Sequence, residues 1–228
     1  MTVQDTKLQQ GAAVARGREG GPARVLVVGG AGYVGSVVCR ALLARGYGVT
    51  VLDNFLYGHA MSVEGIYDEP GYRLVCGDLR DADAVRRAAA GADHAVLLAS
   101  LVGDPVSKAY PELTRSVNAA GSEALLLALD KAGIDRFVFT STCSNYGLRE
   151  DHSLADETSD LKPLSLYAET KVGFERFVLS HLDRLEMCPT LLRIATAFGM
   201  SARMRFDLTV HEFGRAMALK KPLDVYDK

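Results

Sequence analysis

The sequence feature that most constrains the fold is a short apolar run that ends in a cluster of glycines. Residues 25–28 read Val-Leu-Val-Val, and residues 29–35 read Gly-Gly-Ala-Gly-Tyr-Val-Gly. Apolar residues then recur at helical spacing through residue 42. The run is typical of a buried strand, and the spacing after it is typical of a helix. The stretch therefore predicts a strand, a tight turn and a helix.

Three spaced glycines of this turn each suit a nucleotide-binding unit. Gly29 permits the backbone angles of the turn, Gly32 lets the main chain approach a diphosphate, and Gly35 lets the helix pack close to the strand. The free N–H groups at the helix start would then face the phosphates, helped by the helix dipole. An ordinary glycine-rich turn has the same composition, so the interpretation needs a second observation.

That observation is an acid at the end of the next predicted strand. Residues 48–52 read Gly-Val-Thr-Val-Leu and are followed by Asp53 and Asn54, close to the ~20-residue spacing expected after the glycines. A carboxylate there accepts hydrogen bonds from the adenosine ribose and would repel a 2′-phosphate. No arginine adjoins Asp53 in the sequence. The pattern predicts NAD rather than NADP, and the alternative is a solvated acid at a strand end.

Strand-like and helix-like stretches alternate along the rest of the chain, which predicts an α/β fold. Expected strands are residues 72–76, 94–100, 136–140 and 189–194, with another beginning at 223. Expected helices are residues 84–90, 111–132, 165–185 and 206–219. Such alternation implies parallel strands with right-handed crossovers. We expect a Rossmann-like, doubly wound parallel sheet with helices on both faces.

Three regions are expected along the chain. Residues 1–22 are rich in Gly, Ala, Gln and Arg and predict a flexible leader. Residues 23–199 are expected to form an NAD-binding domain that also has the catalytic residues. Residues 200–228 are expected to begin a substrate-binding part.

Composition excludes several classes of partner. The formal net charge is −2 and no long basic run occurs, so nothing predicts binding to nucleic acid. No apolar stretch is long enough to span a membrane, and the N-terminus lacks the apolar core of a signal peptide. The four cysteines show no CxxC spacing, which favours reduced thiols in a cytoplasmic protein over a metal site or a disulfide framework.

Candidate catalytic residues lie on the predicted helix from 165 and on the strand before it. Tyr167 and Lys171 are four residues apart and so share one helix face. A tyrosine with a pKa near ~10 is a poor base, but a nearby ammonium lowers that pKa. Thr142, at the end of the predicted fifth strand, can hydrogen-bond the same substrate oxygen. The set suits removal of an alcohol proton while the carbon gives a hydride to NAD. A solvated helix face is the alternative for Tyr167 and Lys171.

Two further sets of polar residues have both a structural and a functional interpretation. Asp78 and Leu79 follow the third predicted strand, where an acid and an apolar residue could meet the adenine; Asp81 or Asp83 could instead cap the next helix. Asn118 lies on or near an apolar helical stripe. It is either a core amide bonded to backbone or a residue that supports the site, and both can hold.

Taken together, these motifs resemble the extended short-chain dehydrogenase/reductase family, in its branch of nucleotide-sugar epimerases and dehydratases. The resemblance covers residues 24 to about 199. The matching pieces are Gly29 to Gly35, Asp53-Asn54, Gly77-Asp78-Leu79, Asn118 to Gly121, Ser141 to Gly147, Tyr167 to Lys171, Leu192-Arg193 and Phe198-Gly199.

The resemblance implies a role for each matched position. Tyr167 would be the base, Lys171 would hold the ribose and tune Tyr167, and Thr142 would be the hydroxyl partner. Asn118 would support the site from the neighbouring helix. Contacts to the cofactor are expected from Gly29, Gly32, Tyr33, Val34, Gly35, Asp53, Asn54, Asp78, Leu79, Ala99, Asn118, Tyr167 and Lys171.

The sequence also departs from the family pattern. Leu97 and Met200 replace a His and a Pro that many relatives have, and Thr196 replaces an Asn that touches the sugar diphosphate. Dehydratases of the 4,6 type follow the threonine with Asp-Glu, whereas here Cys143 and Ser144 follow it, which argues against that reaction. Cys143, Ser144 and Thr196 are candidate substrate contacts, and a buried strand-end thiol is the alternative for Cys143.

The expected function is an NAD-dependent epimerase that acts at C4 of a nucleotide-linked hexose through a transient 4-keto sugar. The alternatives are a 4-ketoreductase or dehydrogenase of the same sugar class, and a truncated NAD-binding module without catalysis. Relatives continue beyond the strand from 223, so the chain is expected to be either naturally short or truncated. A homodimer is also expected, because six apolar residues on the helices from 111 and 165 exceed the needs of one sheet face: Leu125, Leu126, Leu129, Phe174, Phe177 and Val178.

Overall fold

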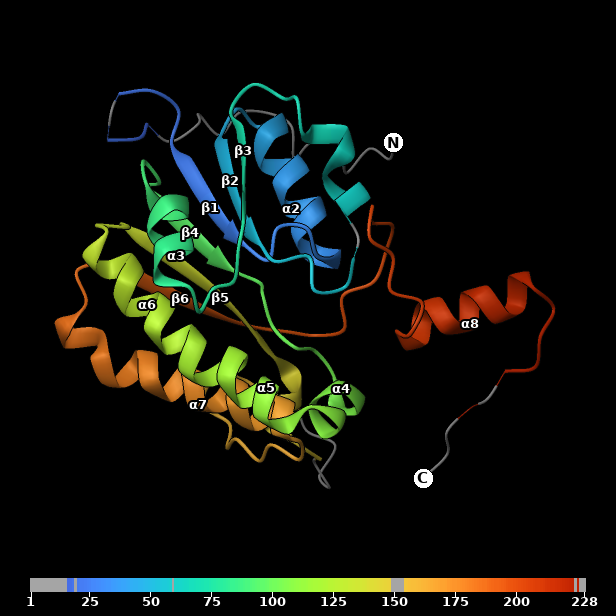
Figure 1. Ribbon diagram of the computed structural model, residues 1–228. Coiled ribbons are helices and arrows are strands. Elements are labelled where there is room, and N and C mark those ends of the chain that lie inside the picture. Colours follow the sequence, from blue (N-terminus) through green and yellow to red (C-terminus); the bar gives the residue numbers. More distant parts are fainter. Residues whose placement is uncertain (1–15, 19, 59, 149–153, 224, 226–228) are drawn as a thin grey trace.

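A computed structural model describes residues 16–18, 20–58, 60–148, 154–223 and 225. Its centre is a sheet of six parallel strands in the order β3-β2-β1-β4-β5-β6 (Figure 1). This order reverses between β1 and β4, as in doubly wound nucleotide-binding folds, and confirms the predicted fold class. The strands are β1 (Arg24–Val28), β2 (Gly48–Asp53), β3 (Tyr72–Cys76), β4 (His94–Leu97), β5 (Arg136–Thr142) and β6 (Cys188–Ile194).

Helices connect the strands. The α-helices are α2 (Tyr33–Ala44), α3 (Ala82–Ala89), α4 (Asp104–Ala109), α5 (Pro111–Arg115), α6 (Ser122–Lys131), α7 (Leu166–His181) and α8 (Thr209–Ala218). Shorter turns are the 3-10 helices η1 (Ala60–Ile66), η3 (Cys143–Tyr146) and η4 (Leu182–Arg184), and the π-helical η2 (Ser116–Gly121). These elements agree with the predicted alternation, although the predicted strand from 223 reaches residues outside the described part.

Alternation of side chains along β1 divides the core into two layers. Val25 and Val27 pack with Cys39 of α2 on one face of the sheet. Leu26 and Val28 pack on the other face with side chains from α3, α6 and α7. Because successive strand residues point to opposite faces, a continuous apolar strand such as β1 requires helices on both sides.

Two boundaries differ from the sequence prediction. The helix expected over residues 111–132 is interrupted by η2, whose π-helical turn includes Asn118; such turns are frequent at functional sites. The strand expected over 94–100 ends at Leu97, because the N–H groups of Leu98 and Ala99 both donate to the Val28 carbonyl at 2.9 Å. The chain then turns away into α4, which the sequence pattern did not predict.

Part of the segment predicted as a leader contacts the sheet. Residues 1–15 lie outside the described part, but Arg16 pairs with Pro22 in an isolated bridge. The backbone N–H groups of Arg18 and Arg24 donate to the two carboxylate oxygens of Asp93, at 2.9 and 2.8 Å. Asp93 therefore ties the segment before β1 to the start of β4.

The prediction that the apolar residues of the two long helices form a dimer surface is wrong for most of them. Leu125, Leu126, Leu129, Phe174 and Val178 are buried within the chain itself. Phe177 is partly buried and packs against the same core. The reason is that α6 and α7 pack against each other and against the sheet, so these side chains contribute to the core of the chain itself.

We expect Gly35→Ala to destabilise the fold because a methyl group there would lie 2.1 Å from the Gly29 carbonyl oxygen and 2.7 Å from Gly30 Cα. Both are backbone atoms that cannot move without opening the turn, so the free energy of unfolding should fall by about 1–3 kcal/mol or more. Gly173→Ala is a matched control, since that exposed position of α7 has open space. It should gain roughly 0.5–1 kcal/mol. Urea unfolding measures both, and equal stabilities would contradict the packing argument.

Candidate active site

A cleft of about 670 Å³ opens at the carboxyl ends of the strands. It lies where the strand order reverses, which is the usual place for a ligand in an open α/β sheet. Its walls are the glycine turn after β1, the ends of β2 to β5, the first turns of α7, and the segment that follows β6.

The structure brings nearly all the predicted site residues to this cleft. Asn118 is the exception: its side chain accepts from the Leu101 N–H at 2.9 Å, donates to the Leu101 carbonyl at 3.0 Å, and contacts Thr170 Oγ1 at 3.5 Å. It supports a cleft loop and α7 from beneath. The residues that line the cleft are Gly29, Gly32, Tyr33, Val34, Gly35, Asp53, Asn54, Asp78, Leu79, Ala99, Thr142, Cys143, Ser144, Tyr167, Lys171 and Thr196.

The glycine turn presents backbone donors to the cleft. Gly29 has a positive φ of 87°, and a Cβ there would lie 2.5 Å from the Ala99 nitrogen, so only glycine fits. The N-cap of α2 is Gly32, which has no side chain to bond the first N–H groups of the helix, and the first turn has no acid. These N–H groups and the positive end of the helix dipole suit a diphosphate.

Asp53 links this turn to the loop after β2. Its two carboxylate oxygens accept from the N–H groups of Ala31, at 3.0 Å, and Phe55, at 2.9 Å. Burial raises the pKa of Asp53, while these hydrogen bonds and Arg203 oppose the shift. Each oxygen has a second lone pair, so the carboxylate can also accept from a ribose hydroxyl.

The acid after β3 is held by its neighbours. Arg80 donates to both Asp78 oxygens at 2.8 Å, and Asn54 Nδ2 donates to Asp78 Oδ2 at 3.0 Å. The hydrogen bond from Arg80 is the main cause that lowers the pKa of Asp78 to about 2. Asp81 caps α3 by accepting from Asp83 and Ala84. The helix cap therefore uses Asp81, whereas the predicted contact to the adenine would use Asp78 and Leu79, so the two interpretations do not exclude each other.

Thr142, Tyr167 and Lys171 converge from β5 and α7. The cap of α7 is Ser165, whose hydroxyl accepts from the Ala168 N–H at 3.3 Å, and this places Tyr167 in the first turn. The side chains of Thr142 and Tyr167 both line the cleft, and the Thr142 hydroxyl accepts from the Ser144 N–H at 3.2 Å. Lys171 Nζ lies 5.8 Å from the centre of the Tyr167 ring. The set is the arrangement expected for removal of an alcohol proton.

The electrostatics of this set differ from the prediction in one respect. Burial raises the pKa of Tyr167, and the opposing influences are Arg205 first and Thr142 second. Lys171 was expected to lower that pKa. Instead its ammonium donates to the Thr140 carbonyl at 2.9 Å, and burial lowers its own pKa to about 7. A lysine that is bonded elsewhere and has a lowered pKa stabilises the Tyr167 phenolate less than a fully charged ammonium beside the phenolate would.

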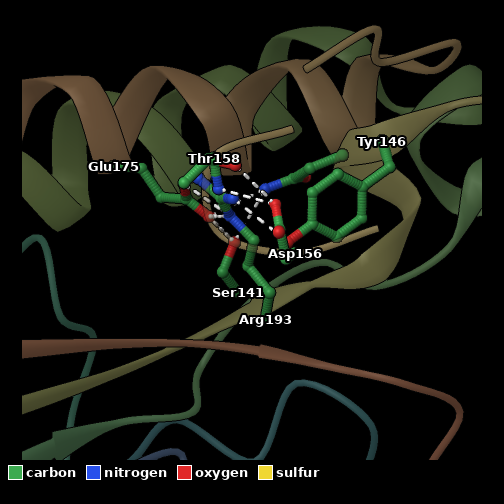
Figure 2. Close-up of polar contacts among 7 residues, drawn as sticks. Ser141, Tyr146, Asp156, Thr158, Glu175 and Arg193 are labelled. Atoms are coloured by element: carbon green, nitrogen blue, oxygen red, sulfur yellow. Dashed lines mark hydrogen bonds and ion pairs between the residues drawn. The ribbon is translucent and has the colours of Figure 1, made fainter. Parts of the chain in front are cut away.

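A buried polar network, which the sequence analysis missed, supports this set (Figure 2). Glu175, one turn after Lys171, is 1 % exposed and accepts from Ser141 Oγ and from Asn145 Nδ2 at 2.8 Å. Arg193 of β6 forms a bidentate pair with it, with Nη2–Oε2 at 2.7 Å and Nε–Oε1 at 3.2 Å. Arg193 Nη1 also donates to the Tyr146 hydroxyl at 3.1 Å. The sequence did contain a signal for this network, because an acid on an apolar helix face, here Glu175 four residues after Lys171, requires a buried partner.

Comparison with known proteins identifies the family. A sequence model of the NAD dependent epimerase/dehydratase family matches residues 25–227. The chain belongs to this family. As the resemblance implied, it is of the extended short-chain dehydrogenase/reductase type, and solved structures similar to it are complexes with NAD.

Individual members of the family are similar over most of this chain. A UDP-glucose 4-epimerase from Rhizobium leguminosarum bv. trifolii is 36% identical over 178 residues, which are 77% of this chain and 52% of that protein. A 3 beta-hydroxysteroid dehydrogenase/Delta 5→4-isomerase from Mycobacterium tuberculosis is 37% identical over 166 residues, 69% of this chain and 42% of that protein. The chain thus spans about half the length of these relatives.

Solved structures agree on the fold. UDP-glucuronic acid 4-epimerase from Bacillus cereus, in complex with UDP-glucuronic acid and NAD, superposes with a TM-score of 0.81 at 25% identity. It covers 90% of this chain, which corresponds to 66% of that chain. DesIV, a dTDP-glucose 4,6-dehydratase from Streptomyces venezuelae with NAD bound, superposes with a TM-score of 0.82 at 29% identity. The match covers 90% of this chain and 65% of DesIV.

The described residues were also compared with the requirements for a membrane-spanning helix and for a metal site. None of the helices in the described part is long and apolar enough to cross a membrane. Among the described residues, His, Cys, Asp and Glu nowhere form a group of three that could hold a metal ion.

We expect Glu175→Gln to destabilise the protein by about 3–5 kcal/mol, because it leaves the largely buried Arg193 guanidinium without its counter-charge. The double variant Glu175→Gln/Arg193→Met removes both charges and should recover much of the loss. Glu169→Gln, an exposed position on the same helix, is the control and should change stability by no more than about 0.5 kcal/mol. Urea unfolding gives the values, and a double variant less stable than either single variant would contradict the pairing.

The titration of Lys171 predicts how stability depends on pH. The unfolded chain holds the Lys171 proton up to about pH 10.4, whereas the folded protein releases it at a pKa of about 7. Between these values the unfolded state binds more protons, so stability rises with pH. From pH 7 to pH 9 the wild type should gain roughly 2 kcal/mol relative to Lys171→Met. Subtracting the variant's curve cancels the other titrating groups, and parallel curves would mean that Lys171 keeps its usual pKa.

Proposed function

We propose that this protein is an NAD-dependent epimerase that inverts C4 of a nucleotide-linked hexose. The observation that supports this most directly is that Thr142, Tyr167 and Lys171 line the same cleft as the glycine turn and Asp53. This arrangement would put a proton acceptor beside a bound dinucleotide, which is what reversible oxidation of a secondary alcohol requires.

In the proposed reaction, the Tyr167 phenolate takes the proton of the C4 hydroxyl. Thr142, which lines the same cleft as Tyr167, holds the same substrate oxygen and so directs it toward the base. A bound NAD would supply the acceptor for the C4 hydride and the donor for its return to the opposite face of the ring. The C–H and O–H bonds are replaced by a C=O bond, and Tyr167 returns the proton when the alcohol reforms. Lys171 holds the nicotinamide ribose.

Comparison with relatives supports the nucleotide-sugar assignment. The relatives include UDP-glucose 4-epimerases, and the structural neighbours include UDP-glucuronic acid 4-epimerase. A dehydratase like DesIV is less well supported, because elimination of water needs an acid and a base after the threonine. Cys143 and Ser144 occupy those positions at the cleft. With Thr196, they are the side chains that we propose to contact the sugar.

A net dehydrogenase or reductase is the second candidate. Its specific support is the similarity to a 3 beta-hydroxysteroid dehydrogenase/Delta 5→4-isomerase. The chemistry at Tyr167 is the same, but the hydride would not return to the same molecule. The stoichiometry of the cofactor separates the two functions. A module that only binds NAD is disfavoured by the assembled set of Thr142, Tyr167 and Lys171.

We also propose how the parts of the protein are used. Residues 23–199 would bind NAD and supply the catalytic groups, and residues 200–228 would begin the substrate-binding part. A homodimer through α6 and α7 would use their exposed apolar positions, Leu127 at 39% and Leu179 at 54%, rather than the buried ones predicted. The cytoplasm is the proposed location, supported by four free cysteines.

We expect Tyr167→Phe to lower the rate of hydride transfer by roughly two to four orders of magnitude, the usual effect of a positioned base. Affinity for NAD should change little, because only the ionisable hydroxyl is lost. Tyr110→Phe, an exposed position outside the cleft, is the matched control. The measurements are single-turnover reduction of bound NAD by a UDP-hexose and calorimetric titration of NAD.

The same assay tests the proposed reaction against its rival. An epimerase converts UDP-glucose and UDP-galactose into each other with catalytic NAD and accumulates no NADH. Production of one NADH per product would favour the dehydrogenase. Full turnover by Tyr167→Phe would exclude the proposed mechanism for both candidates.

A further inference from the structure

The segment that follows β6 is tied to the start of α2. Tyr33 donates its hydroxyl hydrogen to the Gly199 carbonyl at 2.9 Å. The Ser201 hydroxyl donates to the Tyr33 carbonyl at 2.7 Å and lies 2.9 Å from the Ser36 hydroxyl. Residues 199–208, here called the strap, therefore run past the glycine turn before α8 begins (Figure 1). Its residues 203–208 form part of the cleft wall.

Arg203 of the strap faces the side of the cleft where Asp53 lies. Its guanidinium carbon is 4.5 Å from the centre of the Tyr57 ring, in the loop after β2, and its charge opposes the rise in the pKa of Asp53 that burial causes. Arg203 Nε is buried and has no hydrogen-bond partner among the described residues. Within the same residues, no carboxylate oxygen lies within 4.0 Å of its guanidinium. A buried donor without a partner is costly, so an anion at this place would stabilise it.

Arg205 lies further along the cleft. It pairs with Asp207, with Nη2–Oδ2 at 2.5 Å, and its side chain is 20% exposed. Its charge acts on Tyr33 of the glycine turn and on Tyr167 of α7, and it opposes the rise in the pKa of both. The two strap arginines therefore extend from the ribose acid Asp53 toward the catalytic base.

A dinucleotide in this cleft has its charge between those two ends. The ribose that bonds Asp53 and the nicotinamide at Tyr167 are joined by a diphosphate, which has two negative charges. The glycine turn offers this diphosphate neutral N–H groups from one side, and it has no basic side chain. Charge-assisted hydrogen bonds from arginine are stronger and match phosphate geometry. The strap supplies such groups on the side that the turn leaves open.

We propose that Arg203 and Arg205 bind the diphosphate of NAD from the strap side of the cleft, so that the strap retains the cofactor between turnovers. The proposal rests on NAD as the cofactor and not on the identity of the substrate. It explains the two hydrogen bonds that tie the strap to Tyr33, because a ligand held between strap and turn leaves only when that tie opens. An enzyme that returns the hydride to its own product benefits from slow release of the cofactor.

The test is calorimetric titration of NAD into the full chain and its variants. Arg203→Met and Arg205→Met should each weaken NAD binding about tenfold to a hundredfold, the effect of losing one charge-assisted hydrogen bond. Arg203→Lys should lose less, since the charge remains. Arg215→Met, on α8 outside the cleft, is the matched control and should bind as the wild type does. Thermal unfolding of each variant shows whether it is folded before its affinity is interpreted.

Two further titrations decide which phosphate the arginines bind. With UDP as probe, the variants should bind as the wild type does; a loss confined to UDP would mean that the arginines serve the substrate and would overturn the proposal. With NADP as probe, a larger loss than with NAD would place Arg203 at the ribose 2′ position and would also overturn it. Unchanged affinity for NAD in both methionine variants would do the same.

The retention of the cofactor is tested by its release. Tyr33→Phe and Ser201→Ala remove the two ties but neither arginine. Stopped-flow displacement of NADH should show faster dissociation by about fivefold or more for each, the equivalent of losing one neutral hydrogen bond of about 1 kcal/mol. Dissociation at the wild-type rate in the double variant would show that the strap does not retain the cofactor.

Discussion

The buried pair of Glu175 and Arg193 is the interaction on which one side of the cleft depends: the side with the proposed catalytic residues Thr142, Tyr167 and Lys171, here called the catalytic half. Its atoms come from α7 and β6, and Ser141 and Asn145 bring in β5 and the turn after it. A carboxylate as buried as that of Glu175 is stable only when its lone pairs accept hydrogen bonds. This requirement restricts α7, β5 and β6 to the relative positions in which the partners of Glu175 reach it. Thr142 follows Ser141 in β5, and Lys171 precedes Glu175 by one turn of α7. The pair therefore helps to position Thr142 relative to Tyr167, the hydroxyl partner and the base of the proposed reaction.

The other side of the cleft, at the glycine turn, is proposed to bind the cofactor and is here called the cofactor half. It depends on close contact of backbone with backbone. Gly35 allows α2 to lie against the Gly29 carbonyl, and Asp53 joins the same turn to the loop after β2. These contacts use no large side chain, and they leave the first N–H groups of α2 directed to the cleft. Sheet pairing between β1 and β4 and between β4 and β5 joins this half to the catalytic half. The two halves of the cleft thus lie at the same edge of one sheet, at the carboxyl ends of its strands.

The electrostatics of the cleft follow from its depth. Lys171 is buried beside the apolar ring of Phe139, and this burial lowers its pKa. Arg205 belongs to the strap, and its hydrogen bond with Asp207 raises its pKa, so it stays charged. The cation that acts most on Tyr167 in this structure is therefore remote in sequence from the helix that has Tyr167. A lysine one turn away was the obvious partner from spacing alone, but spacing does not report burial.

The sequence by itself determined the order of elements, the parallel sheet, the cleft edge and most residues that line it. These follow from local rules: glycines where the backbone must turn or approach closely, an acid at the end of β2, and Tyr167 and Lys171 one helical turn apart. The tertiary structure alone decided what depends on distant segments meeting. It buried Leu125 and Phe174 in one core instead of on a surface, paired Glu175 with Arg193, and brought Arg203 near Asp53. The two charged contacts join residues that are 18 positions apart, for Glu175 and Arg193, and 150 positions apart, for Arg203 and Asp53. No periodicity or local propensity of a chain specifies which distant charges will be buried together.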